Sequence, residues 1–328
     1  MVAGNVARVR LRRSDPGGPG WRRRARGRGF SYESADGSVP DAAELARIKS
    51  LAIPPAWRDV WICPHANGHL QAVGTDSAGR RQYLYHERWR RERDEEKYER
   101  VVTLAPLLPE FRAEVGRALR GRGREHDRVV AVALAMLDHG VFRVGGESSA
   151  EDNGTHGVTT LLCSHVGVRG SAMDFCYPAK GGIEFCTRVV DEDLARAVKV
   201  LRRGRSGDDR LLVDRAGGEV TAEEANERFK DLVGQEYSVK DLRTWHAMVL
   251  AAVALARAER PSSQRGRKRV EAAVMREVSE HLGNTPAVAR KSYVDPRLVE
   301  LYGKGVVLAD VDGDRETVEK AVVELLST

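Results

Sequence analysis

Residues 125–140 read EHDRVVAVALAMLDHG, and this stretch decides the class of fold. Every position from 129 to 137 is apolar, and the next charged residue is Asp138. A surface helix keeps one polar face, so a helix that is apolar all round has to be buried by other elements. The stretch therefore predicts a buried helix inside a larger helical domain.

The residues that follow predict a small sheet within that domain. Three β-rich segments come in succession: GVTTLLCSHVGV at 157–168, SAMDFCYPAK at 171–180 and GGIEFCTRVV at 181–190. The last two are joined by a short turn at 179–182 that contains two glycines. We expect three short strands, of which the last two form a hairpin.

The rest of the chain is predicted to be helical, because capping residues recur at the spacing that helix termini require. Glycines then follow two of the apolar patterns, which is typical of helix C-termini. A proline directly after a capping threonine indicates the first turn of a further helix. The predicted caps are Asp191, Thr221 with Glu224, Ser238 with Asp241, and Thr285 followed by Pro286, and the predicted ends are Gly234 and Gly283.

Residues 31–92 predict a separate β-rich domain. The short runs DVWICP, HLQAV and RQYLYH are separated by turn residues, and HANGHLQAVG predicts a hairpin through Asn67 and Gly68. A short helix is expected near 41–51. The arginine run WRRRARGRG at 21–29 fits either a flexible basic arm or an exposed strand edge.

The expected fold class is therefore α+β. A β-rich N-terminal domain at 1–92 would precede a mainly helical domain at 93–328, where the pattern turns charged and helical. The second domain would contain the small three-stranded antiparallel sheet.

The charge of the chain favours a polyanionic partner. The net charge is +6, and only ten of the 54 basic residues are lysine. Arginine has a planar fork that binds phosphate through two hydrogen bonds, although a bias in base composition would give the same excess. No uncharged apolar run reaches the roughly 18 residues of a membrane span, and no apolar secretory segment is present. We expect no membrane contact and a cytoplasmic, nucleoid-associated protein.

The four cysteines predict neither a metal site nor a disulfide framework. Cys63, Cys163, Cys176 and Cys186 form no CxxC pair and no zinc-like spacing with histidine. Three of them lie in strand-like segments, where a free cysteine behaves as a small hydrophobe. We expect a reducing compartment, no disulfide, and no bound metal or cofactor.

Tyr293, in LGNTPAVARKSYVDP at 282–296, is a candidate nucleophile. A lone tyrosine on a helix is ordinarily an amphipathic surface residue. Tyrosine hydroxyls ionise near pH 10, so attack on a phosphodiester needs neighbouring positive charge. Arginines can bind the non-bridging oxygens, and a lysine can protonate the leaving oxygen. Arg143, Lys180, Arg243 and Asn284 could provide these cations and a further hydrogen-bond donor.

Six segments in one order make the chain resemble the type IB DNA topoisomerases, in their short poxvirus-like bacterial form, over about residues 30–305. They are IPPAWRDVWICP, GRRQYLYHERWR, FRVGGESSAEDNGTHGVTTL, YPAKGGIEF, KDLRTWHA and LGNTPAVARKSYVDP. The resemblance implies an enzyme that relaxes supercoiled duplex DNA by transient cleavage and religation of one strand. It also implies that this enzyme needs neither ATP nor metal.

The resemblance implies a role for each candidate residue. Arg143 and Arg243 would bind the scissile phosphate, and Lys180 would be the general acid for the 5′ oxygen. Tyr293 would form a 3′-phosphotyrosyl link. Asn284 occupies a position that is histidine in the viral and eukaryotic relatives. Its amide can donate to a phosphate oxygen but cannot shuttle a proton.

The resemblance further implies DNA contacts at Gln82 and Tyr83, with Tyr85 nearby, and at Asn153 and Thr160, and the neighbouring Arg80 and Arg81 are candidates because of their charge. Gln82 can read a base edge in the major groove, and the neighbouring arginines can hold phosphates. Alternation along a strand puts Tyr83 and Tyr85 on one face. Both are therefore expected to contact DNA, unless both point inward as ordinary strand residues.

A tyrosine recombinase is the alternative enzyme, because it shares the arginine, lysine and tyrosine set and a similar helical fold. In recombinases a histidine usually lies three residues before the second arginine, and here that position is Lys240. Their LGH signature is LGN in this chain, and the aromatic β-rich domain is also atypical. A DNA-binding protein without activity is a second alternative, against which the complete catalytic set argues.

We expect a monomer that clamps duplex DNA between its two domains.

Overall fold

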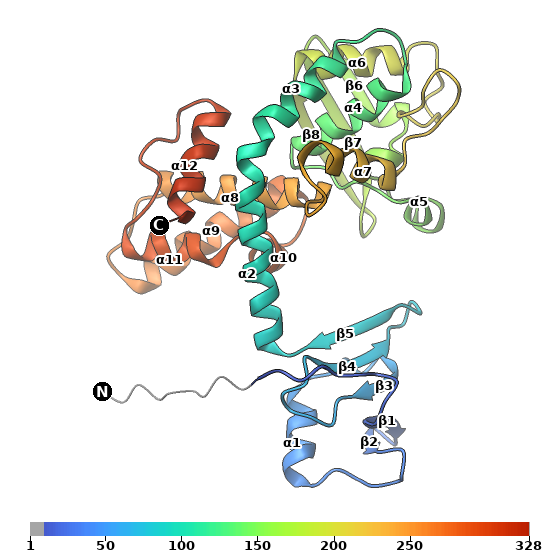
Figure 1. Cartoon of the computed structure of the whole chain (residues 1–328), viewed down its shortest axis with the longest axis vertical. Helices are drawn as coiled ribbons and strands as arrows, with labels where there is room; N and C mark the ends of the chain where they lie inside the picture. The colour runs from blue at the N-terminus through green and yellow to red at the C-terminus, as the bar shows by residue number, and fades with distance from the viewer. Residues whose placement is uncertain (1–9, 328) are drawn as a thin grey trace. The chain divides into compact units, whose positions relative to one another are not determined.

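The computed structural model describes residues 10–327, without the side chains of residues 148 and 149 (Figure 1). The chain divides into two compact units, one ending at Lys97 and the other beginning at Tyr98. The division falls inside helix α2 (Glu87–Leu104). The first unit is β-rich and the second is mainly helical with a three-stranded antiparallel sheet, so the predicted α+β class is confirmed.

The first unit is built on an antiparallel sheet of five strands in the order β2-β1-β3-β4-β5. Its elements are β1 (Trp21–Arg26), β2 (Gly29–Glu33), α1 (Ala42–Ser50), β3 (Arg58–Ile62), β4 (Leu70–Thr75) and β5 (Arg81–Tyr85). The arginine run forms β1 and pairs with β2, so the described part of that run is an exposed strand and not a free arm. Residues 1–9 lie outside the described residues.

The sheet of the first unit buries apolar residues on both faces of β3. Val60 and Ile62 pack with Ile48 of α1, whereas Trp61 lies in a second cluster on the opposite face. A hydrogen bond of 2.7 Å from the Trp21 indole to the Glu44 carboxylate ties β1 to α1. The apolar clusters and the bond to α1 therefore fix the sheet, and the exposed side chains of its edge strand β5 are not needed for this.

The second unit contains the buried helix, the small sheet and a set of capped helices. Its helices after α2 are α3 (Leu108–Leu119), α4 (His126–Asp138), α5 (Glu147–Asn153), α6 (Glu192–Arg202), α7 (Ala222–Val233), α8 (Val239–Arg257), α9 (Gln264–Leu282), α10 (Pro286–Ser292), α11 (Pro296–Lys304) and α12 (Arg315–Ser327). Its strands are β6 (Val166–Arg169), β7 (Ala172–Ala179) and β8 (Ile183–Val190), paired in that order.

Helix α4 is buried from Arg128 to Asp138, as its sequence predicts. Helices α3, α6, α7 and α8 all contact it, and α6 also contacts β7 (Figure 1). Burial raises the pKa of the Asp138 carboxyl, but Arg315 and Arg112 outweigh that effect and hold it below its usual value. This ion cluster fastens α12 to the core. Among the described helices none has both the length and the apolar character needed to span a membrane.

Two local predictions are wrong. The sequence predicts a strand over 157–168, but this segment forms two short 3₁₀ turns, Val158–Thr160 and Cys163–His165, before β6 begins. Hydrogen bonds from its backbone to the loop at 143–144 replace the ladder of a longer strand.

The second wrong prediction is the absence of disulfides, since Cys176 and Cys186 are disulfide-bonded. The register of the β7–β8 hairpin places these two residues directly opposite each other. The cysteine spacing alone does not reveal that register. Cys63 and Cys163 are buried free thiols, which agrees with their predicted role as small hydrophobes.

Candidate active site

Arg243 is the buried centre of the candidate site. It lies in the second turn of α8, after a capping box in which Ser238 and Asp241 bond each other, and it is only 4% exposed. Its guanidinium donates to the carbonyl oxygens of Gly140, Val141 and Leu282. These bonds fix the charged group without neutralising it.

Burial and, to a smaller extent, the positive charge of Arg143 lower the pKa of Arg243 to about 10, although Tyr293 and Tyr177 act in the opposite direction. A group with that pKa stays charged at neutral pH. Among the described residues, neither Arg143 nor Arg243 forms an ion pair with a carboxylate. Two neighbouring cations without a counter-ion form a site that favours an anion.

Arg143 is held by a loop that folds back on itself. Val158 and Thr159 donate backbone hydrogen bonds of 2.9 Å to the carbonyls of Arg143 and Val144. The two chain segments approach so closely that a Cβ on Gly157 would lie 2.5 Å from Gly145, so only glycine fits. With its backbone fixed, Arg143 donates a hydrogen bond of 3.0 Å to the carbonyl of Gly283.

Both arginines therefore bond the same short segment, which leads directly to the tyrosine. Arg243 bonds Leu282 and Arg143 bonds Gly283, where α9 ends in a left-handed conformation. Thr285 caps α10, and Pro286 occupies its first turn. Tyr293 follows the last residue of α10, with its ring centroid 5.5 Å from the Arg243 guanidinium carbon.

Asn284 lies between the two arginine-bound carbonyls and the cap of α10. Its side-chain oxygen and nitrogen are both buried and have no hydrogen-bond partner among the described residues. An unpaired buried amide costs free energy. A ligand that accepts from the nitrogen would remove part of that cost.

The β7–β8 hairpin forms one wall of this site. A Cβ on Gly283 would lie 2.6 Å from the Phe185 ring, so α9 ends directly against β8. Tyr177 lies opposite Phe185 in the hairpin and is 3% exposed. Burial raises the pKa of Tyr177 to about 12, although Arg143 and Arg243 act to lower it, which places this hydroxyl close to both arginines.

Lys180 is exposed in the turn at the tip of the same hairpin. Within the described part of the chain, its ammonium forms no hydrogen bond or ion pair. The structure thus brings together Arg143, Arg243, Asn284 and Tyr293, and it leaves Lys180 on the rim. Sequence reasoning missed Tyr177, because its strand position gives no sign that its inward face meets the two arginines.

The predicted DNA-contacting residues of the first unit lie at and beside β5. Tyr83 and Tyr85 are 47% and 40% exposed, and their rings are stacked with centroids 6.2 Å apart. The inward orientation considered for them is therefore wrong. Gln82 is half-buried and points to the other face, where its amide donates to Asp76 at 2.9 Å.

The two basic residues at the start of β5 are exposed. Arg80 pairs with Asp76 at 3.0 Å, and Arg81 begins the strand. Exposed surface ion pairs contribute little to stability, so Arg80 can exchange its carboxylate for a phosphate at small cost.

Asn153 and Thr160 differ in accessibility. Asn153 is exposed at the end of α5, where it could meet DNA. Thr160 is fully buried, and its hydroxyl both donates to the carbonyl of Gly157 and accepts from its backbone nitrogen. In this structure Thr160 therefore holds the loop behind Arg143 and does not present its hydroxyl to a ligand.

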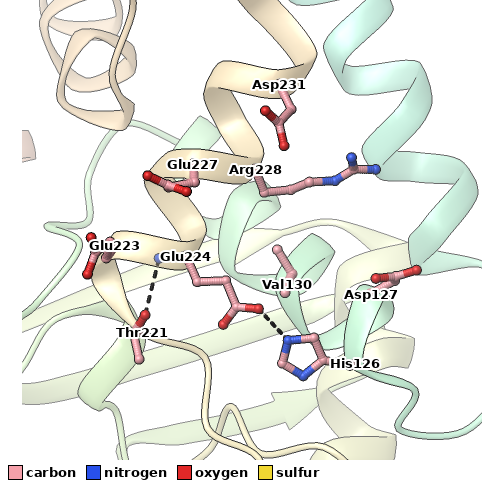
Figure 2. Close-up of a pocket in the computed structure, with 9 residues that line it drawn as sticks. All are labelled: His126, Asp127, Val130, Thr221, Glu223, Glu224, Glu227, Arg228 and Asp231. Carbon is pink, nitrogen blue, oxygen red and sulfur yellow. Dashed lines mark hydrogen bonds and ion pairs between the residues drawn. The ribbon is translucent and has the colours of Figure 1, made fainter. Parts of the chain in front are cut away.

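A cavity of about 440 Å³ elsewhere in this unit is not the phosphate site (Figure 2). Its lining is acidic, with Glu223, Glu227 and Asp231 among its residues, so it repels phosphate. His126 bonds Glu224 and Asp214 there, and both carboxylates raise the pKa of the imidazole. These bonds tie α7 and the 214 turn to α4, which is a structural role.

A β-rich unit is followed by a helical unit in which a tyrosine lies beside Arg243, and no carboxylate among the described residues pairs with Arg143 or Arg243. This is the arrangement expected of an enzyme that cuts DNA through tyrosine. Sequence comparison identifies the family within this class of enzymes. Residues 86–304 match the family described as eukaryotic DNA topoisomerase I, catalytic core, and residues 29–76 match the bacterial DNA topoisomerase IB N-terminal domain. The chain belongs to the type IB DNA topoisomerase family, whose substrate is DNA, and the predicted family is confirmed.

Two relatives matched by sequence agree with this assignment. DNA topoisomerase 1B of Acanthamoeba polyphaga mimivirus is 29% identical over 270 residues, which cover 79% of this chain and 80% of the viral protein. DNA topoisomerase 1 of Mycosarcoma maydis is 24% identical over 129 residues, 39% of this chain and 11% of that protein. The XerH site-specific recombinase, in a post-cleavage complex with palindromic difH substrate, is similar with a TM-score of 0.38 and 12% identity, covering 58% of this chain and 50% of XerH.

Proposed function

We propose that this chain relaxes supercoiled duplex DNA by cutting one strand with Tyr293 and resealing it. The observation that carries the proposal is the convergence of Arg243 and Arg143 on the carbonyls of residues 282 and 283, beside Tyr293. The arginines have no carboxylate partner among the described residues, and a backbone phosphate provides the missing negative charge.

The proposed reaction uses fixed charge to stabilise its transition state. The scissile phosphate binds Arg143 and Arg243, with the amide of Asn284 donating to a non-bridging oxygen. The Tyr293 hydroxyl releases its proton to solvent as its oxygen attacks phosphorus, and the 5′ oxygen leaves with a proton from Lys180. The resulting 3′-phosphotyrosyl bond retains the energy of the phosphodiester, so the reverse attack reseals the strand without nucleotide or metal.

In the proposed mechanism, the hairpin tip that carries Lys180 moves toward the leaving oxygen when DNA binds. Its turn contains Gly181 and Gly182, both with positive φ, which lets the backbone reverse within three residues. A lysine on a long flexible stem at such a tip can reach a leaving group that becomes available only once DNA is bound. Exposure of Lys180 without DNA is compatible with this role.

In the proposed DNA clamp, the β-rich domain at 1–92 and the helical domain at 93–328 together hold the duplex. Exposed Tyr83 and Tyr85 provide ring surface, and Arg80 and Arg81 provide phosphate contacts. Asn153 is the proposed backbone contact near Arg143. We propose a monomer acting on nucleoid DNA in the cytoplasm.

Relaxation of a negatively and a positively supercoiled plasmid, with EDTA and without nucleotide, tests the proposal. We expect complete relaxation of both by the purified chain alone. A strict requirement for ATP or a divalent metal would contradict it, and so would strand transfer that needs paired specific sites, as a recombinase requires. Trapping the adduct on a nicked oligonucleotide duplex, followed by peptide mass measurement, should identify Tyr293.

A further inference from the structure

The hairpin that carries Lys180 has a feature that the proposed reaction does not use. Cys176 on β7 and Cys186 on β8 are directly opposite each other and are joined by a disulfide. Both residues are exposed to solvent. The free thiols of Cys63 and Cys163, by contrast, are buried and out of reach of reagents.

Alternation along the two strands puts this disulfide directly behind the wall of the active site. Cys176 and Cys186 point to solvent, whereas the adjoining Tyr177 and Phe185 point inward. Those two side chains contact the surroundings of Arg143, Arg243 and Gly283. The crosslink therefore joins the two strands of the stem that leads to Lys180.

We propose, on the basis of the function proposed above, that Cys176 and Cys186 form a reversible thiol–disulfide site whose reaction partner is a low-molecular-weight disulfide. The closed form restrains the hairpin and slows protonation of the leaving oxygen by Lys180. Exposed disulfides are the ones that small thiols reduce readily, and they are typical of regulatory sites.

The chemistry of closure is balanced by the small disulfide. One cysteine thiolate attacks a sulfur of RSSR, which forms a mixed disulfide and releases one RSH after protonation. The second cysteine thiolate attacks the protein sulfur of that mixed disulfide and releases a second RSH. The two cysteines thus lose two electrons and two protons, and RSSR gains them. Excess RSH reverses the sequence.

The restraint follows from the position of the bond. Lys180 is exposed in the turn between β7 and β8, and the proposed function moves this tip so that the ammonium reaches the leaving oxygen. A covalent bond between β7 and β8 reduces the freedom of the stem that supports this tip. Glu184 lies within 4.8 Å of both sulfurs, and its negative charge disfavours the thiolates that exchange requires.

The first measurement counts thiols in the full chain. After incubation with reduced or oxidised glutathione, the protein is denatured, alkylated and weighed. We expect four alkylated cysteines after reduction and two after oxidation, with Cys176 and Cys186 protected. The Cys176→Ser/Cys186→Ser variant should show two in both states, and Glu184→Gln should close faster. Four alkylated cysteines at every ratio of the two glutathiones would overturn the proposal.

The second measurement tests the link to Lys180. In single-turnover cleavage of a duplex oligonucleotide, we expect the oxidised chain to be roughly tenfold slower than the reduced chain, since small displacements of a catalytic group have effects of this size or larger. On a substrate with a 5′ thiolate leaving group, which needs little protonation, both forms should cleave equally fast. Equal rates on the ordinary substrate, or equal slowing on both substrates, would refute the restraint.

Hydrogen exchange separates this proposal from the proposed function. Backbone amides at 172–190 should exchange more slowly in the oxidised chain than in the reduced chain, and the serine variant should match the reduced one. This readout and the thiol count do not depend on DNA cleavage. If the chain never formed the Tyr293 adduct but showed both the thiol count and the slower exchange, the proposed function would be refuted. The thiol–disulfide site and its restraint of the hairpin would still stand. Unchanged exchange at 172–190 removes the restraint, whatever the activity.

Discussion

The strand β5 and the site around Arg243 present their functional groups in opposite ways. On β5, Tyr83 and Tyr85 are nearly half exposed, and their rings stack on each other. Arg243 is 4% exposed, and three backbone carbonyls fix its position. An exposed side chain can change its rotamer to fit different DNA segments. A buried charge that is already held in position needs no reorganisation when it stabilises a transition state.

The two regions therefore contribute to different parts of the reaction. Changes on β5 should weaken binding and leave the rate of the bound complex intact. Changes around Arg243 should slow the bound complex, and some should also destabilise the fold.

Tyr293→Phe should abolish cleavage, because it removes the only oxygen proposed to attack phosphorus. The ring would still pack against the core cluster and beside Arg243, so the free energy of unfolding should change little. Adduct formation on a nicked duplex, measured together with DNA affinity, checks both parts. A phosphotyrosyl adduct in this variant would assign the nucleophile to another residue.

Lys180→Ala should slow cleavage by roughly 10²–10⁴-fold, the range typical of removing a general acid. Because Lys180 is exposed in a turn, the melting temperature should stay unchanged. A substrate with a 5′ thiolate leaving group should restore most of the rate. Lack of rescue on that substrate would show that Lys180 does not donate the proton.

The sequence predicted those features of this region that depend on local chemistry. The caps at Asp191, Thr221 and Thr285 form as expected, because each depends on a side chain bonding a backbone nitrogen three residues later. The order of the candidate residues along the chain also identified the family. These features need no knowledge of tertiary structure.

Features that depend on long-range approach were not predicted. Thr160 is buried because Val158 and Thr159 bond the loop of Arg143, which converts an expected strand into turns. The disulfide depends on the register of a hairpin, and the spacing of Cys176 and Cys186 does not state that register. Gln82 points away from Tyr83 because strand alternation separates neighbours, although the resemblance groups them as DNA contacts.

Arg243→Ala and Arg143→Ala should each slow cleavage by roughly 10²-fold or more, because each removes a cation that stabilises the charge of the transition state. They should differ in stability. Arg243→Ala leaves three carbonyls without their donor, which costs about 1–3 kcal/mol or more in unfolding free energy. Arg143 is more exposed and bonds one carbonyl, so its replacement should cost less.

Paired measurements of single-turnover cleavage and denaturant unfolding check this contrast. A variant of Arg243 with wild-type stability would show that the carbonyl bonds are not structural. Arg243→Lys is the matched control, since it keeps the charge but not the fork that reaches several oxygens at once.

Tyr83→Ala/Tyr85→Ala should weaken DNA binding by roughly tenfold, which corresponds to about 1.4 kcal/mol of binding free energy from ring surface in a wet interface. Arg81→Ala should reduce the slope of log K against log salt by the amount expected for about one phosphate. At saturating DNA both variants should cleave at the wild-type rate. Slower cleavage under saturation would contradict a role confined to binding.

Asn284→Ala should have the smallest effect on cleavage, roughly fivefold, because one neutral donor is worth about 1 kcal/mol. Its stability should be nearly unchanged, since the amide has no hydrogen-bond partner among the described residues. Asn284→Asp is the sharper variant, because it keeps the size but places a negative charge where the phosphate is proposed to bind. It should cleave more slowly than the alanine variant, and raising the salt concentration should not restore its rate, since a buried charge is poorly screened. If Asn284→Asp cleaved as fast as the alanine variant, the amide would lie too far from the phosphate to bind it, and the fixed charges of Arg143 and Arg243 would have to stabilise the transition state without it.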